Sequence, residues 1–370
     1  MLRPAHAPII ASRRRRPPGH ALLCAALACA ALTLLVANRA EAVVGGQPLA
    51  ASAVPWYVDV GVCGGTLVAP NRVMTAAQCV DGFPIAALGA ARVGEVVHPI
   101  EGFAMPPGWR RANGRNVLDD IAIVRLGGPV TQVPPVTLGG DPAGELRIVG
   151  RGRPFAPGTD VSLEERFDTT LRSAVLRPLW DRACGRAFGR PRGNAGERFD
   201  AARMRCAIDV DGRPPLSSGC NGDSGGPLVA GMLSPAPVVL GVVSWGGARC
   251  GADRLPSVFT DVERYRSFIA GPPMWAPTTT APSTVTGSRR VGGSLRCDAS
   301  GFASAPSRLE VTWRRQGGRG TPIVSRRRAH TVTRADQGHT LVCMVTASND
   351  GGRAGVPVAL GTSSVKVPRG

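Results

Sequence analysis

Lysine, histidine and aromatic residues are scarce in this sequence of 370 residues. Lys366 is the single lysine beside 43 arginines, and aromatic residues make up 5% of the chain. The five histidines are His6, His20, His98, His330 and His339. The formal net charge is +18, but without a recognition motif or interleaved aromatics it does not predict specific nucleic-acid binding. A hydrophobic fraction of 43% with 19% charged residues excludes a wholly disordered chain.

Metal-binding spacings are missing as well. No Cys-x-x-Cys pair and no closely spaced pair of histidines occurs, so a zinc site has no ligand set on which to build. We therefore expect neither a metal nor a cofactor.

Long apolar runs are limited to one, the 17 uncharged residues from Ala21 to Ala37. A basic block, Arg13 to Arg16, precedes this run, and Ala40-Glu41-Ala42 follows it with small residues at the two positions that a signal peptidase reads. This pattern predicts a secretory signal over residues 1–42, cleaved after Ala42, no membrane span after cleavage, and an extracellular protein. The alternative is an uncleaved anchor, because 17 residues are at the short limit for a spanning helix.

Export changes the interpretation of the cysteines. Removal of residues 1–42 leaves an even number, eight, which in an oxidising compartment favours disulfides over metal ligands. The eight are Cys63, Cys79, Cys184, Cys206, Cys220, Cys250, Cys297 and Cys343.

With 48 glycines and 33 prolines, the chain favours a turn-rich, all-β architecture over long helices. The clearest predicted strands are 56–62, 72–77, 121–126, 146–150 and 238–245, and one helix is predicted over 261–270. A stretch rich in Pro, Thr and Ser, 272–288, reads as an extended linker between residues 43–271 and a second module, 289–370.

Seven short motifs occur in one order along residues 43–271. They are Val43-Val44-Gly45-Gly46, Cys63-Gly64-Gly65-Thr66-Leu67, Thr75-Ala76-Ala77-Gln78-Cys79, Asp120-Ile121-Ala122-Ile123-Val124-Arg125-Leu126, Gly222-Asp223-Ser224-Gly225-Gly226-Pro227-Leu228, Ser244-Trp245-Gly246 and Pro256-Ser257-Val258-Phe259-Thr260. Together they resemble the trypsin-like, chymotrypsin-fold serine proteases over some 230 residues. The resemblance implies two packed antiparallel β-barrels.

The resemblance also implies site residues. It places Ser224 at the nucleophile, Asp120 at the acid that orients the base, and the N–H groups of Gly222 and Ser224 at the oxyanion hole. At the position of the family's catalytic histidine this chain has Gln78, whose amide has no proton affinity near neutral pH. The other histidine of this region, His98 in a Val-His-Pro segment, matches a surface feature of the family and not the base.

Gln78 therefore predicts a secreted protease homologue with impaired catalysis that binds peptides or protein partners through a retained cleft. Two alternatives stay open. One is a working serine endopeptidase that uses Ser224 slowly or with assistance from its substrate. The other is an adhesion protein of the cell envelope in which the barrels serve as scaffold.

Three further features follow from the resemblance. Cleavage before Val43 would free an ammonium group that pairs with Asp223. The first specificity pocket falls on Ser218, Ser244, Trp245, Gly246 and Ser257, and without an aspartate at Ser218 it favours a small or medium apolar side chain. The family pairing joins Cys63 to Cys79, Cys184 to Cys206 and Cys220 to Cys250.

The second module, 289–370, resembles bacterial immunoglobulin-like domains. Cys297, Trp313 and Cys343 follow the order of a sandwich in which tryptophan packs on an inter-sheet disulfide. Residues 277–370 carry 14 basic and 4 acidic residues, a net charge of +10, whereas residues 43–276 carry 24 and 21, a net charge of +3. The arginine runs 289–290, 314–315 and 326–328 fit polyanionic envelope polymers as partners, or else solvated strand edges.

Overall fold

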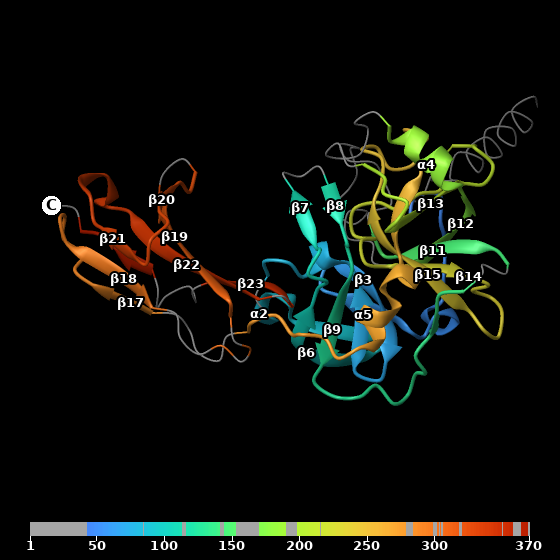
Figure 1. Cartoon of the computed structure of the whole chain (residues 1–370), viewed down its shortest axis with the longest axis horizontal. Coiled ribbons are helices and arrows are strands. Elements are labelled where there is room, and N and C mark those ends of the chain that lie inside the picture. Colours follow the sequence, from blue (N-terminus) through green and yellow to red (C-terminus); the bar gives the residue numbers. More distant parts are fainter. Residues whose placement is uncertain are drawn as a thin grey trace, which may run out of the picture. The chain divides into compact units, whose positions relative to one another are not determined.

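The computed structural model describes residues 43–83, 85–112, 116–140, 144–152, 170–189, 198–214, 216–278, 284–298, 302, 304, 306–317, 320–349, 351–357 and 364–368. The predicted secretory signal, 1–42, lies outside the described residues, as do residues 279–283 of the predicted linker. Figure 1 shows the elements named below.

Six antiparallel strands close a first barrel in the order β2–β3–β4–β9–β6–β5. Side chains such as Leu67, Phe103 and Ile123 fill it and are fully buried. Most of these strands are short and apolar on both faces, which fits walls covered on each side. The strands are β2 (Tyr57–Val60), β3 (Cys63–Ala69), β4 (Arg72–Thr75), β5 (Ala90–Val93), β6 (Val96–Ala104) and β9 (Ala122–Leu126).

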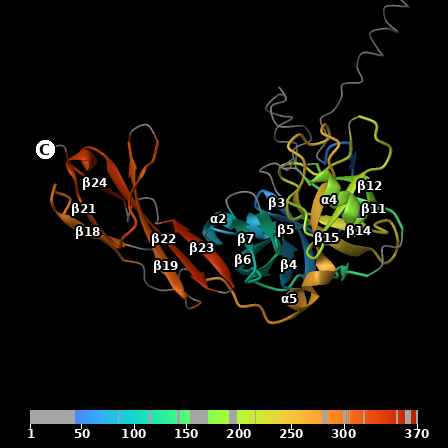
Figure 2. The ribbon, with the colours of Figure 1, turned by 45° about the horizontal axis from the view of Figure 1, so that its top comes forward.

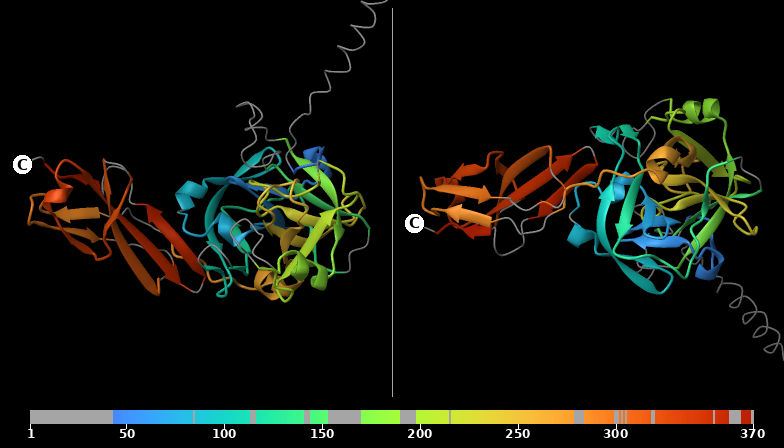
Figure 3. Two further views of the ribbon diagram at one scale, coloured as in Figure 1. Left: turned by 90° about the horizontal axis from the view of Figure 1, so that it is seen from above. Right: turned by 60° about the horizontal axis from the view of Figure 1, so that its bottom comes forward.

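A second barrel closes in the order β12–β11–β14–β15–β16–β13, because β13 pairs back onto β12. Leu228, Leu240 and Phe259 lie in its core. Figures 2 and 3 show its strands from other directions. The strands are β11 (Leu146–Gly150), β12 (Arg172–Pro178), β13 (Met204–Asp209), β14 (Pro227–Ala230), β15 (Val238–Trp245) and β16 (Ser257–Asp261). The all-β prediction of a double barrel is thus confirmed.

Among the described residues of the barrel region, four short strands lie outside the closed barrels. β1 (Gln47–Pro48) pairs with β12, and β10 (Thr137–Leu138) runs parallel to β15. β7 (Arg110–Ala112) and β8 (Asn116–Leu118) form a hairpin that leads to Asp120.

The predicted helix over 261–270 is wrong in one respect. It is a 3₁₀ turn, η3 (Val262–Tyr265), followed by the α-helix α5 (Arg266–Ala270). At the junction Tyr265 has φ −114° and ψ 13°, and its hydroxyl donates to Asp119 Oδ1 at 2.6 Å. This long-range bond holds Tyr265 out of helical geometry, which local periodicity does not encode. The other helices are η1 (Ala51–Ala53), η2 (Ala77–Cys79), α2 (Ile85–Leu88), α4 (Asp181–Ala187) and η4 (Arg334–Asp336).

The first residues of the predicted linker pack with the first barrel. The N–H of Ala276 donates to Phe103 O at 2.8 Å, and Ala276 is fully buried. The Arg125 guanidinium lies 5.0 Å from the centroid of the Trp275 ring. The other end of the predicted linker is also structured, because Thr284–Gly287 form strand β17 and pair with β18. The linker prediction is therefore left with residues 277–283, of which 279–283 lie outside the described residues.

The C-terminal residues form two further sheets, one of three strands and one of five. Along β22, Leu341, Cys343, Val345 and Ala347 are buried and alternate with more exposed residues, as in a strand with one covered face. The first sheet contains β17 (Thr284–Gly287), β18 (Ser294–Asp298) and β21 (Ala329–Thr331). The second contains β19 (Arg308–Gln316), β20 (Ile323–Ser325), β22 (Thr340–Asn349), β23 (Gly352–Pro357) and β24 (Ser364–Lys366).

The prediction of four disulfides is confirmed. The three pairs of the barrel region are Cys63–Cys79, Cys184–Cys206 and Cys220–Cys250. The fourth, Cys297–Cys343, joins β18 of one C-terminal sheet to β22 of the other beside the fully buried Trp313.

Candidate active site

Gln78 and Asp120 meet where the first barrel faces the second. The backbone N–H of Gln78 donates to Asp120 Oδ1 at 2.9 Å, and its side-chain Nε2 donates to Asp120 Oδ2 at 2.9 Å. Nε2 also donates to the carbonyl of Ser244 at 2.5 Å. Because a carboxylate and a carbonyl oxygen only accept, the nitrogen end of the Gln78 amide must face them. The amide is therefore held in one orientation.

The Asp120 carboxylate is buried, with 2% of the residue exposed. Ser244 Oγ donates to its Oδ2 at 2.5 Å, and Thr260 Oγ1 donates to its backbone carbonyl at 2.7 Å. Residues of the second barrel thus fix an aspartate that follows the β7–β8 hairpin of the first. Burial of a carboxylate demands such donors, because an unpaired buried charge is costly.

Ser224 lies in the turn before β14, and this turn packs against the first barrel. The N–H of Gly64 donates to Ser224 O at 2.9 Å. Gly225 has φ +82°, and a Cβ there would lie 2.2 Å from Thr75 Oγ1 and 2.3 Å from Gly64 O. Only glycine fits this close approach, so the Gly-Gly pair after Ser224 has a steric cause.

The N–H groups of Gly222 and Ser224 were predicted to form an oxyanion hole. Gly222 adopts φ +99°, a left-handed conformation that glycine reaches at low cost. In the part of the chain that the structure describes, neither N–H donates to a backbone or side-chain acceptor. Two such donors next to a serine are what a developing oxyanion requires.

Asp223 is fully buried directly before Ser224. Its carboxylate accepts hydrogen bonds from Cys220 N and Gly152 N, each at 2.8 Å. Burial raises the pKa of Asp223 to about 7, although these two donors lower it. No cation pairs with Asp223 among the described residues, which is why desolvation outweighs the hydrogen bonds.

Val43, predicted to pair with Asp223, lies within the second barrel. Its side chain is fully buried in a cluster with Leu146 and Ile148. Val44 follows in an isolated bridge with Ser218, whose N–H donates to Val44 O at 3.1 Å. The segment after the predicted cleavage point is thus already inserted in the barrel.

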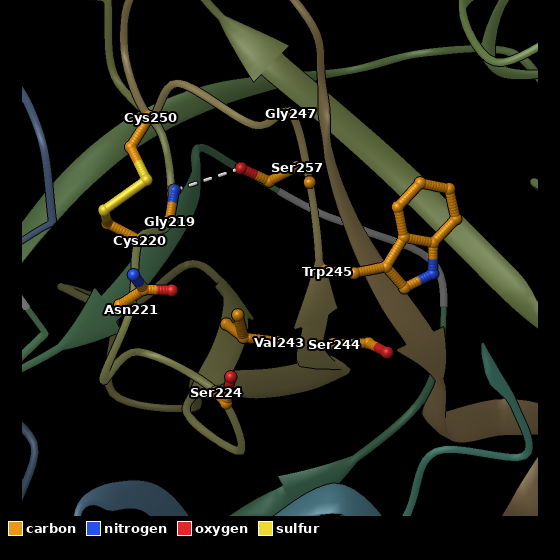
Figure 4. Close-up of a pocket in the computed structure, with 11 residues that line it drawn as sticks. Gly219, Cys220, Asn221, Ser224, Val243, Ser244, Trp245, Gly247, Cys250 and Ser257 are labelled. Carbon is orange, nitrogen blue, oxygen red and sulfur yellow. Dashed lines mark hydrogen bonds between the residues drawn. A yellow bond between two sulfur atoms is a disulfide. The ribbon is translucent and has the colours of Figure 1, made fainter. Parts of the chain in front are cut away.

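Ser224 opens onto a small pocket of about 40 Å³ (Figure 4). Four of the five predicted pocket residues line it: Ser244, Trp245, Gly246 and Ser257. The hydroxyl of Ser257 points across the pocket and accepts a hydrogen bond from Gly219 N at 3.0 Å (Figure 4).

The fifth predicted pocket residue, Ser218, is not among the lining residues. It is buried, and its hydroxyl has no hydrogen-bond partner among the described residues. Two lining residues that sequence reasoning missed are Gly219 and Asn221. Both residues are next to Cys220 in the sequence, and this position was the signal that could have placed them in the pocket.

The comparisons with known proteins decide the family. The family model described as trypsin matches residues 43–269. The chain belongs to the trypsin family.

Several members are similar to this trypsin-family chain. It is 29% identical to Kallikrein 1-related peptidase b3 of Mus musculus, over 61% of this chain and 88% of that protein. It is 31% identical to Serine protease 56 of Homo sapiens, over 61% of this chain but 38% of that longer protein. Neuropsin, a serine protease expressed in the limbic system of mouse brain, superimposes with a TM-score of 0.49 at 26% identity, over 61% of this chain and 97% of that structure.

An ion pair between the barrels was missed by sequence reasoning in this trypsin-family chain. Arg151 Nε lies 3.0 Å from Asp59 Oδ1, and the Arg151 guanidinium lies 5.9 Å from the centroid of the Tyr57 ring. Burial raises the pKa of Asp59, while Arg151 and Arg92 lower it. No motif or periodicity links β2 to the residue after β11, so no local signal marks this pair.

The described residues contain no helix with the length and apolar character needed to cross a bilayer. Nor do they contain a group of three or more His, Cys, Asp or Glu side chains placed to hold a metal ion.

Proposed function

We propose that this trypsin-family chain is a secreted protease homologue that binds peptides or protein partners through its cleft and that turns substrate over poorly. The observation that carries the proposal is the amide of Gln78. It donates to Asp120 Oδ2 and to Ser244 O, the contacts that would orient a basic ring at this position. The hydrogen-bond frame of a catalytic triad is kept by a group that cannot accept a proton.

The chemistry of acyl transfer explains why this exchange matters. A serine hydroxyl is almost never ionised at its own pKa and needs a neighbouring base to lose its proton. An amide cannot take that proton or return it to a leaving amine. Loss of one essential triad member removes on the order of a million-fold in turnover, and leaves about 10³ to 10⁴ over water.

The binding parts of the site support the other half of the proposal. Ser224, the donors of Gly222 and Ser224, and the pocket behind them are all present. None of the described residues that line the pocket carries a carboxylate, so a Lys or Arg side chain of a peptide would find no countercharge among them. Ser257 reaches across the pocket and narrows it. We infer a preference for a small or medium apolar side chain.

Export is the second part of the proposal. Cleavage after Ala42 would place a new ammonium group on Val43, whose side chain is already buried in the second barrel. Asp223, buried and without a cationic partner among the described residues, is the carboxylate that this ammonium would neutralise. Signal removal alone would then complete the ordered site. Four disulfides suit a protein that works outside the cell.

We assign the C-terminal module to the immunoglobulin-like domains on three features. Two sheets are joined by Cys297–Cys343, Trp313 is fully buried beside that disulfide, and both cysteines alternate with less buried neighbours along their strands. An inter-sheet disulfide with a packed tryptophan is typical of that sandwich.

The proposal is tested with the mature chain beginning at Val43 and its Gln78→His, Ser224→Ala and Gln78→His/Ser224→Ala variants. A fluorophosphonate probe and a peptide ester with alanine or valine before the scissile bond report on serine reactivity. We expect wild type to react no faster than Ser224→Ala. Gln78→His should label and hydrolyse at least 10³-fold faster, and the double variant should return to background.

Two results would contradict the proposal, and they do so in different ways. Wild-type hydrolysis at the rate of Gln78→His, abolished by Ser224→Ala, would establish a working protease that uses a different base or its substrate. A folded but inert Gln78→His variant would show that more than the base is missing. Thermal unfolding of each variant serves as the control for folding.

A further inference from the structure

The three acidic residues of the C-terminal module that the structure describes each pair with an arginine of the same module. Asp298 pairs with Arg296 at 2.9 Å, and Glu310 pairs with Arg308 at 2.9 Å. Asp336 is fully buried and accepts from Arg315. Burial alone would raise its pKa, but donors from Thr333, His330 and Arg315 prevail and lower it to about 2. Among the described residues of the module, no acidic side chain is left to neutralise the remaining arginines.

Six other arginines of this module are exposed and have no ion pair among the described residues. They are Arg289, Arg290, Arg326, Arg327, Arg328 and Arg334. An arginine guanidinium carries five N–H donors in a planar fork that matches sulfate, phosphate and carboxylate groups.

The sheet β17–β18–β21 places these arginines along one line. The turn between β17 and β18 carries Arg289 and Arg290, and its Gly292 N donates to Val332 O at 2.8 Å, two residues before Arg334. At the other end of the sheet, Cys297 N donates to Arg328 O at 2.9 Å. The sheet thus has, at each end, three arginines without an ion pair to any described residue.

The face between the two ends is mostly polar. Thr286, Arg296 and Ala329 lie side by side across the three strands, and Ser294 pairs with Thr331 next to them. All five side chains are exposed. From Arg328 to Arg334 the chain rises by about 20 Å, at about 3.3 Å per residue. We define this face with its six flanking arginines as the arginine track.

The length and chemistry of the arginine track indicate its ligand. A distance of about 20 Å spans several repeat units of a linear polymer, which can contact both ends at once. The module contains two aromatic residues, Phe302 and Trp313. Trp313 is buried and Phe302 is half-buried, so the described surface offers no exposed ring on which bases could stack.

We propose that the arginine track is a binding surface for a linear anionic polysaccharide. Guanidinium forks at the two ends contact successive anionic groups, and the exposed threonines and serine between them contact sugar hydroxyls. Binding releases counterions and therefore weakens with salt. The track is separate from the Ser224 site and does not depend on whether that site is active.

The test uses the mature full chain and immobilised dextran sulfate, with uncharged dextran as the blank. Arg327→Gln/Arg328→Gln and Arg289→Gln/Arg290→Gln each remove two charges from one end of the track. The matched control is Arg182→Gln/Arg186→Gln, which removes two exposed arginines from α4 outside the module.

We expect wild type to bind dextran sulfate and not dextran at 150 mM NaCl. Each track variant should raise Kd at least tenfold and lower the slope of log Kd against log salt by about two. The control variant should stay within twofold of wild type.

Three outcomes would overturn the proposal. The first is no binding to dextran sulfate at 150 mM NaCl. The second is an equal loss of affinity in the control variant, which would show that net charge and not the track is responsible. The third is an equal, track-dependent affinity for oligo(dT), which would assign the surface to nucleic acid. Far-ultraviolet circular dichroism of each variant confirms its fold.

Discussion

Glutamine and histidine differ less in shape than in chemistry at position 78. The amide Nε2 donates to Asp120 and to Ser244 O, so a buried carboxylate keeps a donor in place. A donor is all that the carboxylate requires of its neighbour, and this requirement does not discriminate between an amide and an imidazole. The hydrogen bonds around Asp120 are therefore kept without the base, because stability needs a hydrogen-bond donor at position 78 and catalysis needs a proton acceptor there.

We therefore expect the Asp120 carboxylate to contribute to the stability of the fold. Asp120→Asn places an NH₂ group against the N–H of Gln78 or the hydroxyl of Ser244, which are donors. We expect a loss of about 2 kcal/mol or more, because a buried donor is left facing donors. Ser244→Ala removes one bond and should cost about 1 kcal/mol.

Urea unfolding at pH 7 measures both variants. Equal losses, or an Asp120→Asn variant as stable as wild type, would show that the carboxylate is not held by these bonds. The Ser244→Ala variant, which removes a donor but leaves the carboxylate, is the matched comparison.

At the scale of elements, the segment 43–46 and the turn of Asp223 depend on each other. Val43 packs in the second barrel, and Asp223 is tied by Gly152 N and Cys220 N. At Gly152 a Cβ would lie 2.6 Å from Asp223 Cγ, so only glycine lets the strand end approach the carboxylate this closely. The turn that contains Ser224 is thus held by hydrogen bonds to the buried carboxyl group of Asp223, so the protonation state of that group should affect stability.

Stability of a form that retains residues before Val43 should depend on pH. The pKa of Asp223 is raised to about 7, so between about pH 4 and pH 7 the folded state holds a proton that the unfolded state releases. The free energy of unfolding should fall as pH rises through this range, by about 4 kcal/mol at most, and stay level above it. The chain beginning at Val43 should show a smaller fall, because its ammonium stabilises the carboxylate.

Urea unfolding at pH 4.5 and pH 7.5 compares the two forms. Asp223→Asn in the longer form is the control and should remove this part of the pH dependence. The same pH profile in both forms would count against the pairing of Val43 with Asp223.

At the scale of the whole molecule, the apolar cores are separate. The C-terminal module has its own cluster around Leu295, Trp313 and Leu341, which shares no residue with the clusters of the barrels. A core of its own is what a domain needs to unfold as a unit.

Calorimetry of the mature chain should therefore resolve two transitions. Cys297→Ser/Cys343→Ser removes a disulfide that closes a separation of 46 residues, worth about 4 kcal/mol in chain entropy. It should lower one transition and leave the other, and the fluorophosphonate reactivity of a Gln78→His background, unchanged. A single transition that moves as a whole would contradict independent cores.

Much of the fold and site was accessible from residues alone, and the failures share a cause. The order of motifs from Val43 to Thr260 predicted the double barrel, and four of five pocket residues line the pocket. The single helix over 261–270 was wrong because Tyr265 is bonded to Asp119. The Arg151–Asp59 pair was missed because its partners come from different barrels.

The scarcity of histidine was informative because acid–base chemistry depends on the side chain present at each position. The sequence by itself determined that residue 78 cannot take up a proton, because proton affinity is a property of the functional group. It also determined that His98 is the one histidine in the barrel region. Tertiary structure alone decided that the Gln78 amide points at Asp120, that Ser218 is not among the residues lining the pocket, and that the arginines flank the two ends of one sheet. Strand register and barrel closure set those positions through contacts between residues far apart in the chain, which no local pattern encodes.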